Sequence, residues 1–237
     1  MILSAPVFRL KRQAKRLSRT DGIPLVAALD RIARQEGFQS WSLLAARLSK
    51  SRPAPDLLSR LQPGDLVLLG ARPGQGKTLL GLDLIVEALK AGRQGVFITL
   101  EYNDADVLDS LRSIGAEPAG LDGGFTLDTS DDINAATIIE RLADPRPGAI
   151  AVVDYLQVLD QKRTSPAIGA QLADLKAFAA TSGMILVFLS QIDRSYALSG
   201  NPMPDIGDIR MPNPVDPAVF SKTCFLNDGR IRFEAVA

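Results

Sequence analysis

The sequence contains no histidine and only one cysteine, Cys224, among its 237 residues. Because histidine is the commonest general base and metal ligand, any catalysis would have to use carboxylates, lysine, hydroxyls or a bound metal. One cysteine excludes an internal disulfide and any zinc site built from several cysteines, and it suits a reducing compartment. The sequence therefore excludes disulfide scaffolds and histidine-based chemistry.

Long hydrophobic runs are also missing. The sequence has no stretch of about 18 apolar residues, and its first residues, MILSAPVF, lack the basic start of a signal peptide. We therefore expect a soluble, cytoplasmic protein without a membrane partner. With 46% hydrophobic residues, the chain can bury one sizeable core.

The net charge of zero hides an asymmetry. Residues 1–60 carry 12 Lys and Arg against 4 Asp and Glu, whereas residues 61–237 carry 15 against 23. Such a division suggests two units with different partners. We expect a small basic helical unit over residues 1–50, a charged and proline-containing linker over 51–56, and a second unit over 57–237.

Three short helices are expected in the basic unit. The first spans residues 9–19, Pro24 is placed to open the second, and Ser40 is placed to cap the third. The first helix has one apolar face, and basic side chains cover the rest of it, including Lys11, Arg12, Lys15 and Arg16. These cations have two interpretations, a solvated surface or contacts to the phosphate backbone of DNA.

Apolar runs alternate with helical patterns in the second unit. Runs typical of buried strands occupy residues 65–69, 95–100, 125–127, 149–153 and 184–189. Strands that are apolar throughout and separated by helices indicate a parallel sheet covered on both faces. Near the end of the chain, Asn-Asp-Gly between two strand patterns predicts a β-hairpin. The predicted fold class is α/β.

Turn-forming residues indicate where the helices of this unit begin. Asn103 would cap one helix, Ser130 or Asp131 would cap the next, and Ser165-Pro166 would open the helix after the fourth strand.

Residues 65–80, DLVLLGARPGQGKTLL, join a strand to a glycine-rich loop and a helix, which is the context of a phosphate-binding loop. In such a loop, backbone N–H groups and the helix N-terminus hold the phosphates, the lysine reaches the β/γ oxygens and the threonine ligates Mg²⁺. Alanine stands where the first glycine is usual, with Gly70 one residue earlier. The expected ATP-binding residues are Ala71, Arg72, Pro73, Gly74, Gln75, Gly76, Lys77 and Thr78. A glycine-rich turn without a ligand is the alternative.

Polar residues follow three of the expected strands, and ligands of open parallel sheets bind beyond these strand ends. Asp154 follows the run AIAVV and is placed to hold Mg²⁺. Because Tyr155 rather than glutamate comes next, Glu101 is the best remaining carboxylate to orient an attacking water. Gln191 could hydrogen-bond the γ-phosphate. The expected catalytic residues are Glu101, Lys77 and Gln191, and the expected metal ligands are Thr78 and Asp154. Ordinary turn or solvated residues at the strand ends are the alternative.

The runs ARPGQGKT, TLE, VVDYLQVL and LSQIDRS, in this order, resemble the ATPase domain of DnaB-type replicative DNA helicases in the RecA-like P-loop superfamily. The resemblance covers about residues 57–237. It implies ATP and Mg²⁺ as cofactors, with Lys77 and Thr78 binding phosphate and metal, Glu101 as the catalytic carboxylate, Asp154 as the metal aspartate and Gln191 linking the γ-phosphate to DNA-contacting loops.

The same resemblance implies partners. Single-stranded or forked DNA would be bound, with Arg194 of the LSQIDRS run as a further candidate contact. The chain would associate with itself, for example as a hexameric ring, and would contact other replication proteins.

The chain departs from that family in two regions. The Lys-x-Arg pair, which in the family reaches the ATP of a neighbouring subunit, corresponds here to Lys222 followed by Cys224, and the nearest arginines are Arg230 and Arg232. Loss of such an arginine finger lowers turnover by about 10³–10⁵ in other phosphoryl-transfer enzymes. Residues 201–217, where DNA-facing loops are expected, hold five prolines and one basic residue.

Two functions are therefore considered. The first is a DnaB-helicase-like ATP hydrolase that couples hydrolysis to action on DNA. The second is a non-motor ATP-binding regulator or loader-like accessory protein with weak turnover, which the missing Lys-x-Arg pair and the acidic second unit favour. A RecA-like clock or signalling ATPase is a third option, and the Asp-Tyr-Leu-Gln run argues against it.

Overall fold

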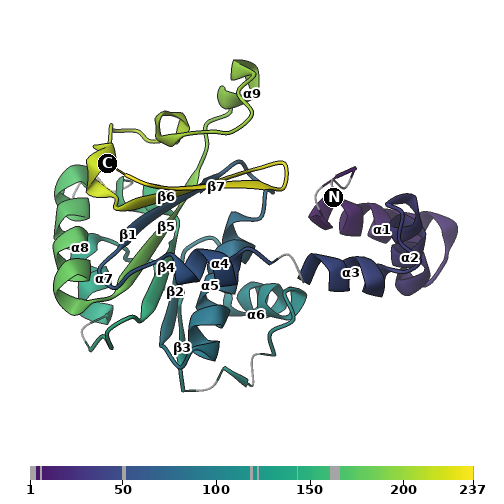
Figure 1. The fold of residues 1–237 in the computed structure, drawn as a ribbon, viewed down its shortest axis with the longest axis horizontal. Coiled ribbons are helices and arrows are strands. Elements are labelled where there is room, and N and C mark those ends of the chain that lie inside the picture. The colour runs from purple at the N-terminus through teal and green to yellow at the C-terminus, as the bar shows by residue number, and fades with distance from the viewer. Residues whose placement is uncertain are drawn as a thin grey trace. The chain divides into compact units, whose positions relative to one another are not determined.

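In the computed structural model the chain forms two compact units, Met1–Pro53 and Ala54–Ala237 (Figure 1). The structure describes residues 4–5, 7–49, 52–117, 120–121, 123–142, 144–160 and 166–236. Helix α4, Ala54–Ser59, begins inside the range 51–56 that was expected to be a linker. It forms there because Leu57 and Leu58 pack into the core of the larger unit.

The smaller unit contains helices α1 (Val7–Asp21), α2 (Leu25–Gln35) and α3 (Trp41–Ser49). Its buried cluster comprises Leu10, Ala14, Ala28 and Ile32. Helix α2 begins at Leu25, one residue later than predicted, and Pro24 is its N-cap. Ser40 precedes α3 as predicted, and its hydroxyl accepts a hydrogen bond from the Leu43 N–H at 3.3 Å. The helices thus follow the apolar spacing of the sequence.

The larger unit is built on a seven-stranded sheet with the order β3-β2-β4-β5-β1-β6-β7. The strands are β1 (Leu66–Ala71), β2 (Gly95–Thr99), β3 (Phe125–Asp128), β4 (Ile150–Asp154), β5 (Ile185–Gln191), β6 (Lys222–Asn227) and β7 (Arg230–Ala235). Strands β1 to β6 are parallel, and β7 pairs antiparallel with β6. The α/β fold with a mostly parallel sheet and a C-terminal hairpin is confirmed.

Helices cover both faces of this sheet (Figure 1). On one face lie α4, α5 (Lys77–Lys90) and α6 (Asp104–Ser113), and on the other lie α7 (Ala135–Arg141) and α8 (Ile168–Ser182). Val67 and Leu69 of β1 enter the first core, whereas Leu66 and Leu68 enter the second. Burial on both faces is the reason why these strands are apolar at every position.

Short helical turns complete the larger unit: α9 (Tyr196–Ser199) and the 3₁₀ helices η2 (Leu156–Asp160), η3 (Ile206–Asp208) and η4 (Pro217–Val219). Within the described residues, none of the helices combines the length and the apolar character needed to cross a membrane.

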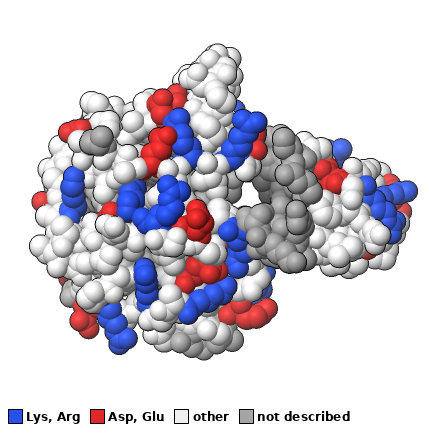
Figure 2. Space-filling model, in the orientation of Figure 1, with Lys and Arg blue, Asp and Glu red and all other residues white. Residues whose placement is uncertain are grey.

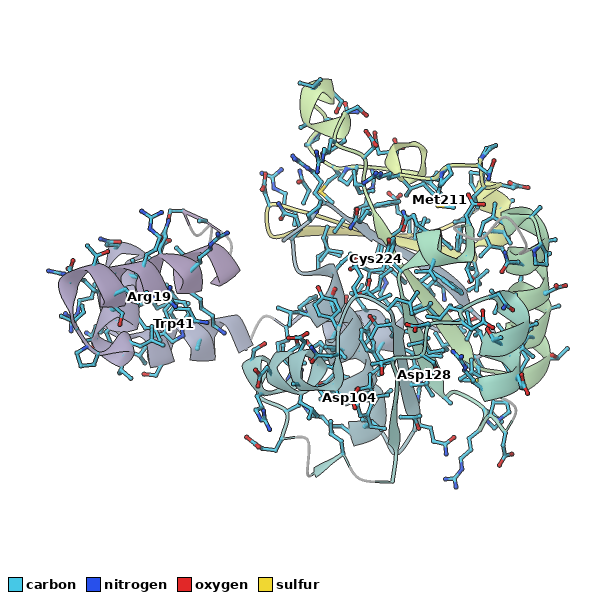
Figure 3. All side chains as sticks on the ribbon, turned by 180° about the vertical axis from the view of Figure 1, so that it is seen from behind. Arg19, Trp41, Asp104, Asp128, Met211 and Cys224 are labelled. Atoms are coloured by element: carbon cyan, nitrogen blue, oxygen red, sulfur yellow. The ribbon has the colours of Figure 1, made fainter. Side chains whose placement is uncertain are left out.

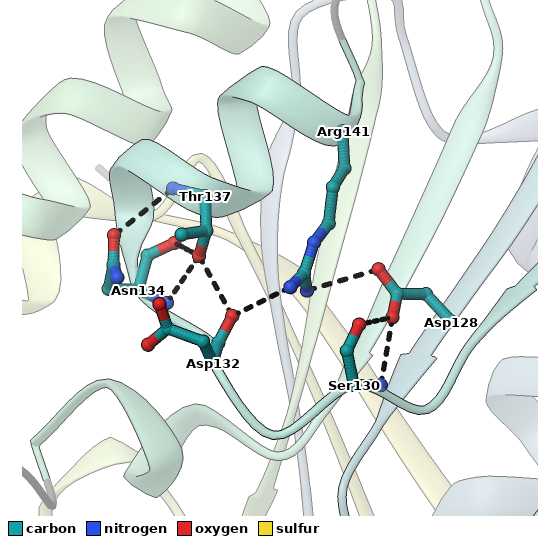
Figure 4. A network of polar contacts seen from close by, with 6 residues as sticks. All are labelled: Asp128, Ser130, Asp132, Asn134, Thr137 and Arg141. Carbon is teal, nitrogen blue, oxygen red and sulfur yellow. Dashed lines mark hydrogen bonds and ion pairs between the residues drawn. The ribbon is translucent and has the colours of Figure 1, made fainter.

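Helix α7 begins later than the sequence predicts. Its N-cap is Asn134, not Ser130 or Asp131 (Figure 4). The Asn134 side chain accepts a hydrogen bond from the Thr137 N–H at 3.1 Å, and the Thr137 hydroxyl accepts one from the Asn134 N–H at 2.9 Å. Local preference offers several polar caps in this stretch, and burial of Ile133 in the second core decides which one is used.

The predicted cap Ser130 has another partner in the structure. Its N–H donates to the Asp128 carboxylate at 2.9 Å, and that carboxylate also pairs with Arg141 at 3.0 Å (Figure 4). Helix α8 likewise begins at Ile168 rather than at Pro166, whose carbonyl accepts a hydrogen bond from a side-chain amide at 2.8 Å. The proposed start at Ser165 lies outside the described residues.

Candidate nucleotide-binding site

The loop between β1 and α5 has the backbone conformation that phosphate binding requires. Gly74 and Gly76 have φ angles of 78° and 92°, a region that side chains disfavour. Gly76 is the N-cap of α5, so the first N–H groups of that helix have no partner inside the helix. A Cβ at Gly76 would meet no atom within 4 Å. The space in front of the helix is therefore open to an anion.

Gly70, which stands one residue before the usual first glycine of the loop, is needed for close packing of β1 against β6. A Cβ at Gly70 would lie 2.6 Å from the ring of Phe225, its partner on β6. Ala71 is buried at the end of β1, beside Gln191 of β5. Gly70 is thus required by the contact between β1 and β6, while Gly74 and Gly76 shape the loop.

The carboxyl edge of the sheet brings together residues that are far apart in the sequence. Lys77 Nζ lies 2.5 Å from Asp154 Oδ1 and 3.8 Å from Glu101 Oε2. The Thr78 hydroxyl donates a hydrogen bond to Asp154 Oδ2 at 2.8 Å. Parallel pairing of Thr99 with Asp154 places the ends of β2 and β4 at one edge. The predicted residues Lys77, Thr78, Glu101 and Asp154 therefore form one cluster.

The centre of this cluster is a buried ion pair. Asp154 has no exposed surface and Lys77 is 7% exposed. A buried carboxylate is strongly unfavourable unless its charge is compensated and its oxygens are hydrogen-bonded. Both conditions hold here, because Lys77 and Thr78 each serve one oxygen. The charge of Asp154 is thus compensated by groups of the chain itself.

Glu101 differs from Asp154 in its environment. Burial raises the pKa of Glu101 above 4.5, and the charge of Asp154 acts in the same direction, while Lys77 opposes the shift. The side chain keeps 33% of its surface exposed, so water reaches it. Its N–H donates to the Thr99 hydroxyl at 3.1 Å, which positions the residue at the strand end. A more basic carboxylate in contact with solvent suits the orientation of a water molecule.

Gln191 lies at the same edge but outside the ion-pair cluster. It is paired with Ala71, next to the glycine-rich loop. Its carbonyl accepts a hydrogen bond from the Arg210 N–H at 2.8 Å, and the next residue, Ile192, pairs with Ile209. Gln191 thus joins the edge of the loop to the segment that was expected to face DNA.

The structure shows two sets of contacts at this edge that the sequence did not predict. The buried amide of Gln157 donates to Ser190 Oγ at 2.9 Å and to the Arg210 carbonyl at 2.7 Å. In the glycine-rich loop, Gln75 Oε1 accepts from the Asp228 N–H at 3.1 Å and Gln75 Nε2 donates to Asp228 Oδ1 at 3.4 Å. Gln157 lies in the distinctive Asp-Tyr-Leu-Gln run and Asp228 in the hairpin turn, but neither motif indicates its partner.

In the region that corresponds to the Lys-x-Arg pair, Lys222 forms an ion pair within the chain and Cys224 is buried. Lys222 Nζ lies 2.5 Å from Asp65 Oδ2. Cys224 is in the sheet of the larger unit (Figure 3), and burial raises the pKa of its thiol to about 12. Arg232 donates to a backbone carbonyl at 2.6 Å, whereas Arg230, beside the hairpin turn, is exposed.

The predicted DNA-contacting cations lie on both units. Arg194 is exposed two residues after Ile192, beyond the end of β5. On the face shown in Figure 2, basic and acidic side chains are interspersed over the described part of the larger unit. In the smaller unit the candidates all lie on α1, with Lys11 half-buried and the other three exposed: Lys11, Arg12, Lys15 and Arg16.

Among the described residues of the smaller unit, no acidic side chain forms an ion pair with these α1 cations. Asp21 pairs with Arg31 at 2.8 Å, the Asp30 carboxylate accepts from a backbone N–H at 2.8 Å, and the Glu36 carboxylate accepts from the Ser4 N–H at 2.8 Å. Like charges four residues apart on a helix repel one another. The basic face of α1 thus keeps its charge available to an external polyanion.

Comparison with known proteins gives three findings. A family model described as ATPase: KaiC matches residues 29–203. A probable plasmid replicative DNA helicase from Chlamydia psittaci is 26% identical over 183 residues, which cover 63% of this chain and 40% of that protein. A UPF0273 protein from Pyrobaculum aerophilum is 28% identical over 159 residues, covering 58% and 56%. The chain thus spans about half the length of these curated relatives.

A solved structure has the same fold. A DnaB-like replicative helicase, described with its interactions with primase, matches with a TM-score of 0.56 and 15% identity, covering 94% of this chain and 66% of that one. At this identity the likeness concerns the fold, which is the RecA-like fold of DnaB-type ATPase domains.

Proposed function

The chain belongs to the KaiC family of ATPases, and on that premise we propose that it hydrolyses ATP with Mg²⁺ and couples hydrolysis to action on DNA. The observation that carries the proposal is the cluster of Lys77, Glu101 and Asp154 in front of a glycine-rich loop. The DNA part is supported by the name of one relative, a probable plasmid replicative DNA helicase, and by the cations of α1, for which no ion pair is found among the described residues.

The oxygen donors at the edge fit a nucleotide-bound Mg²⁺. Such an ion is held by few protein oxygens, with phosphate oxygens and water completing its shell. Thr78 and Asp154, whose oxygens are 2.8 Å apart, would hold it, and the bound ion would neutralise charge on the phosphates. The N–H groups behind Gly74 and Gly76 would hold the phosphates themselves.

Lys77 and Glu101 then have separate tasks. Lys77 Nζ lies at the edge, where it donates to Asp154, and it would bind the β/γ oxygens of a nucleotide. Glu101 accepts a hydrogen bond from the attacking water and orients it toward the phosphorus. Gln191 would report the loss of the γ-phosphate to residues 201–217 through the backbone pairing of Arg210.

The experiment is a comparison of ATP hydrolysis with and without single-stranded DNA. Wild type should be stimulated by DNA, and Glu101→Gln should lower turnover by about 10²–10⁴ while it retains nucleotide binding. Glu117→Gln, which changes an exposed carboxyl outside the cluster, is the matched control. Unchanged turnover in Glu101→Gln would contradict the catalytic assignment. A wild-type rate that ignores DNA would contradict the coupling.

A second candidate function is a non-motor ATP-binding accessory protein that docks on a replication protein. The pairing of Lys222 with Asp65 and the burial of Cys224 favour it, because neither of these two positions then supplies a cation to a neighbouring subunit. Sizing with ATP and Mg²⁺ separates the two. A motor should form higher oligomers such as a hexameric ring, with Arg230 available to act between subunits, whereas an accessory protein should stay small.

A further inference from the structure

A cavity of about 210 Å³ lies at the edge of the sheet opposite to the glycine-rich loop. It is bounded by the segments that precede β2, β3 and β4, and its lining includes Arg93, Gln94, Arg146, Gly92 and Gly124. Drug-sized ligands occupy cavities of roughly 300–1,000 Å³. This cavity therefore suits a compact chemical group.

One charged side chain of this cavity has an unused donor. Arg93 Nη1 is buried and has no hydrogen-bond partner among the residues that the structure describes. The Arg93 side chain runs beside Gly148, where a Cβ would lie 3.8 Å from its Cδ and Nε. Within the described residues, neither Arg93 nor the exposed Arg146 forms an ion pair with a carboxylate. Buried donors in proteins are nearly always paired, so an acceptor is missing here.

Arg93 and Arg146 lie in a unit that has an excess of acidic residues. Residues 54–237 carry 16 Lys and Arg against 24 Asp and Glu, so carboxylates outnumber cations. The neighbouring cation Lys90, at the end of α5, does pair with Glu87 at 2.8 Å. Both arginines line one cavity, and no carboxylate is found among the described residues of its lining, which points to an external anion.

We propose that this cavity binds the phosphate group of a small molecule, held by the guanidinium groups of Arg93 and Arg146. Arginine is suited to this because its planar group donates paired N–H bonds to phosphate oxygens. The flanking glycines, Gly92 and Gly124, let the backbone approach such a group closely.

This site is separate from the nucleotide site and does not rest on the proposed function. Lys77 begins α5 and Arg93 lies three residues beyond the end of that helix. The 14 residues of α5 span about 20 Å, so one ligand of this size cannot occupy both places.

The test is a calorimetric titration of inorganic phosphate into the full chain while a non-hydrolysable ATP analogue saturates the glycine-rich loop. We expect one saturable binding event in the wild type, with an affinity weakened about tenfold or more by Arg93→Gln and by Arg146→Gln. Lys90→Gln, a matched loss of charge just outside the cavity, should leave it unchanged.

Three outcomes would overturn the proposal. They are no saturable binding, binding that both arginine variants retain, and a single-stranded oligonucleotide that binds through these arginines when inorganic phosphate does not. Melting curves identify a variant that fails to fold. If Arg93→Gln is such a variant, Arg93→Lys and the exposed Arg146→Gln decide, because neither removes a buried side chain outright.

Discussion

At the scale of single residues, Asp154 is the centre of the polar contacts at the carboxyl edge of the sheet. It is fully buried, and its two oxygens are served by Lys77 and Thr78. Removal of one partner of a buried ion pair leaves an uncompensated charge and is strongly destabilising. Substitution of Lys77 would therefore affect both folding and phosphate binding. Glu101, which is partly exposed, is the cleaner site for a mechanistic test.

The pH dependence of hydrolysis should report Glu101. This carboxylate must be deprotonated to orient water, and burial raises its pKa above the ordinary 4.5. We predict that turnover falls on the acid side with an apparent pKa above 4.5, measured as a pH–rate profile at saturating ATP and Mg²⁺. An acid limb at or below that value would contradict the prediction. The residual activity of Glu101→Gln should lack this limb.

The same pKa shift has a defined sign for stability. A raised pKa means that the folded protein binds the proton more tightly than the unfolded chain does. The contribution of Glu101 to the free energy of unfolding is therefore complete below its unfolded pKa and is lost as the pH rises through its folded pKa. Urea denaturation of wild type and Glu101→Gln on both sides of this window would measure the difference.

At the scale of elements, the contact between α5 and the sheet depends on Gly81. A Cβ at this position would lie 2.9 Å from Val152 Cγ1 and 3.3 Å from Leu189 Cδ1, both in buried strands. We predict that Gly81→Ala lowers the free energy of unfolding by about 1–3 kcal/mol because it overpacks this interface. Urea denaturation measures the change.

The control for Gly81 is Gly169 in α8. A Cβ at Gly169 would meet nothing within 4 Å. Gly169→Ala should therefore raise the free energy of unfolding by about 0.4–1 kcal/mol, because alanine lowers the conformational entropy of the unfolded chain. Equal effects of the two substitutions would show that close packing at Gly81 is not the cause.

The start of α7 gives a second test at this scale. Asn134 forms a reciprocal pair of hydrogen bonds with Thr137, whereas the exposed Asp131 does not cap the helix. We predict that Asn134→Ala lowers the free energy of unfolding by about 0.5–2 kcal/mol. Asp131→Ala should change it by less than about 0.5 kcal/mol. If Asp131→Ala lowers the free energy of unfolding more than Asn134→Ala does, the helix is capped by Asp131, as the sequence suggested.

At the scale of the whole molecule, charge is divided between the two units. Residues 1–53 carry 11 Lys and Arg against 3 Asp and Glu, and residues 54–237 carry 16 against 24. The three acidic residues of the smaller unit have partners away from the basic face of α1. We propose that the smaller unit is a separate domain whose role is contact with the phosphate backbone of DNA.

This proposal predicts a specific salt dependence. Each cation that contacts single-stranded DNA contributes about 0.7 to the slope of log K against log salt. Replacement of four cations by glutamine should weaken binding and reduce the slope by about 3, measured by fluorescence anisotropy; the four are Lys11, Arg12, Lys15 and Arg16. Replacement of Lys90 and Arg112 on the larger unit is the control, and equal slopes in all proteins would contradict the proposal.

Local features of this protein could be predicted from the sequence alone. The apolar runs predicted every parallel strand from β1 to β5, and the Asn-Asp-Gly turn predicted the β6–β7 hairpin. Gly74 and Gly76 indicated the phosphate loop because only glycine adopts their φ angles readily. These features depend on dihedral preference and on the periodicity of burial, which are encoded within a few consecutive residues.

The partners of these elements were decided by the tertiary structure. Asp154 meets Lys77, and Asp228 meets Gln75, only because the strand order places their loops at one edge. The cavity with Arg93 and Arg146 arises in the same way at the opposite edge. Strand order depends on how two hydrophobic cores pack across the sheet, and no short stretch of sequence contains that information. The sequence by itself determined which groups the protein has, and packing decided which of them meet.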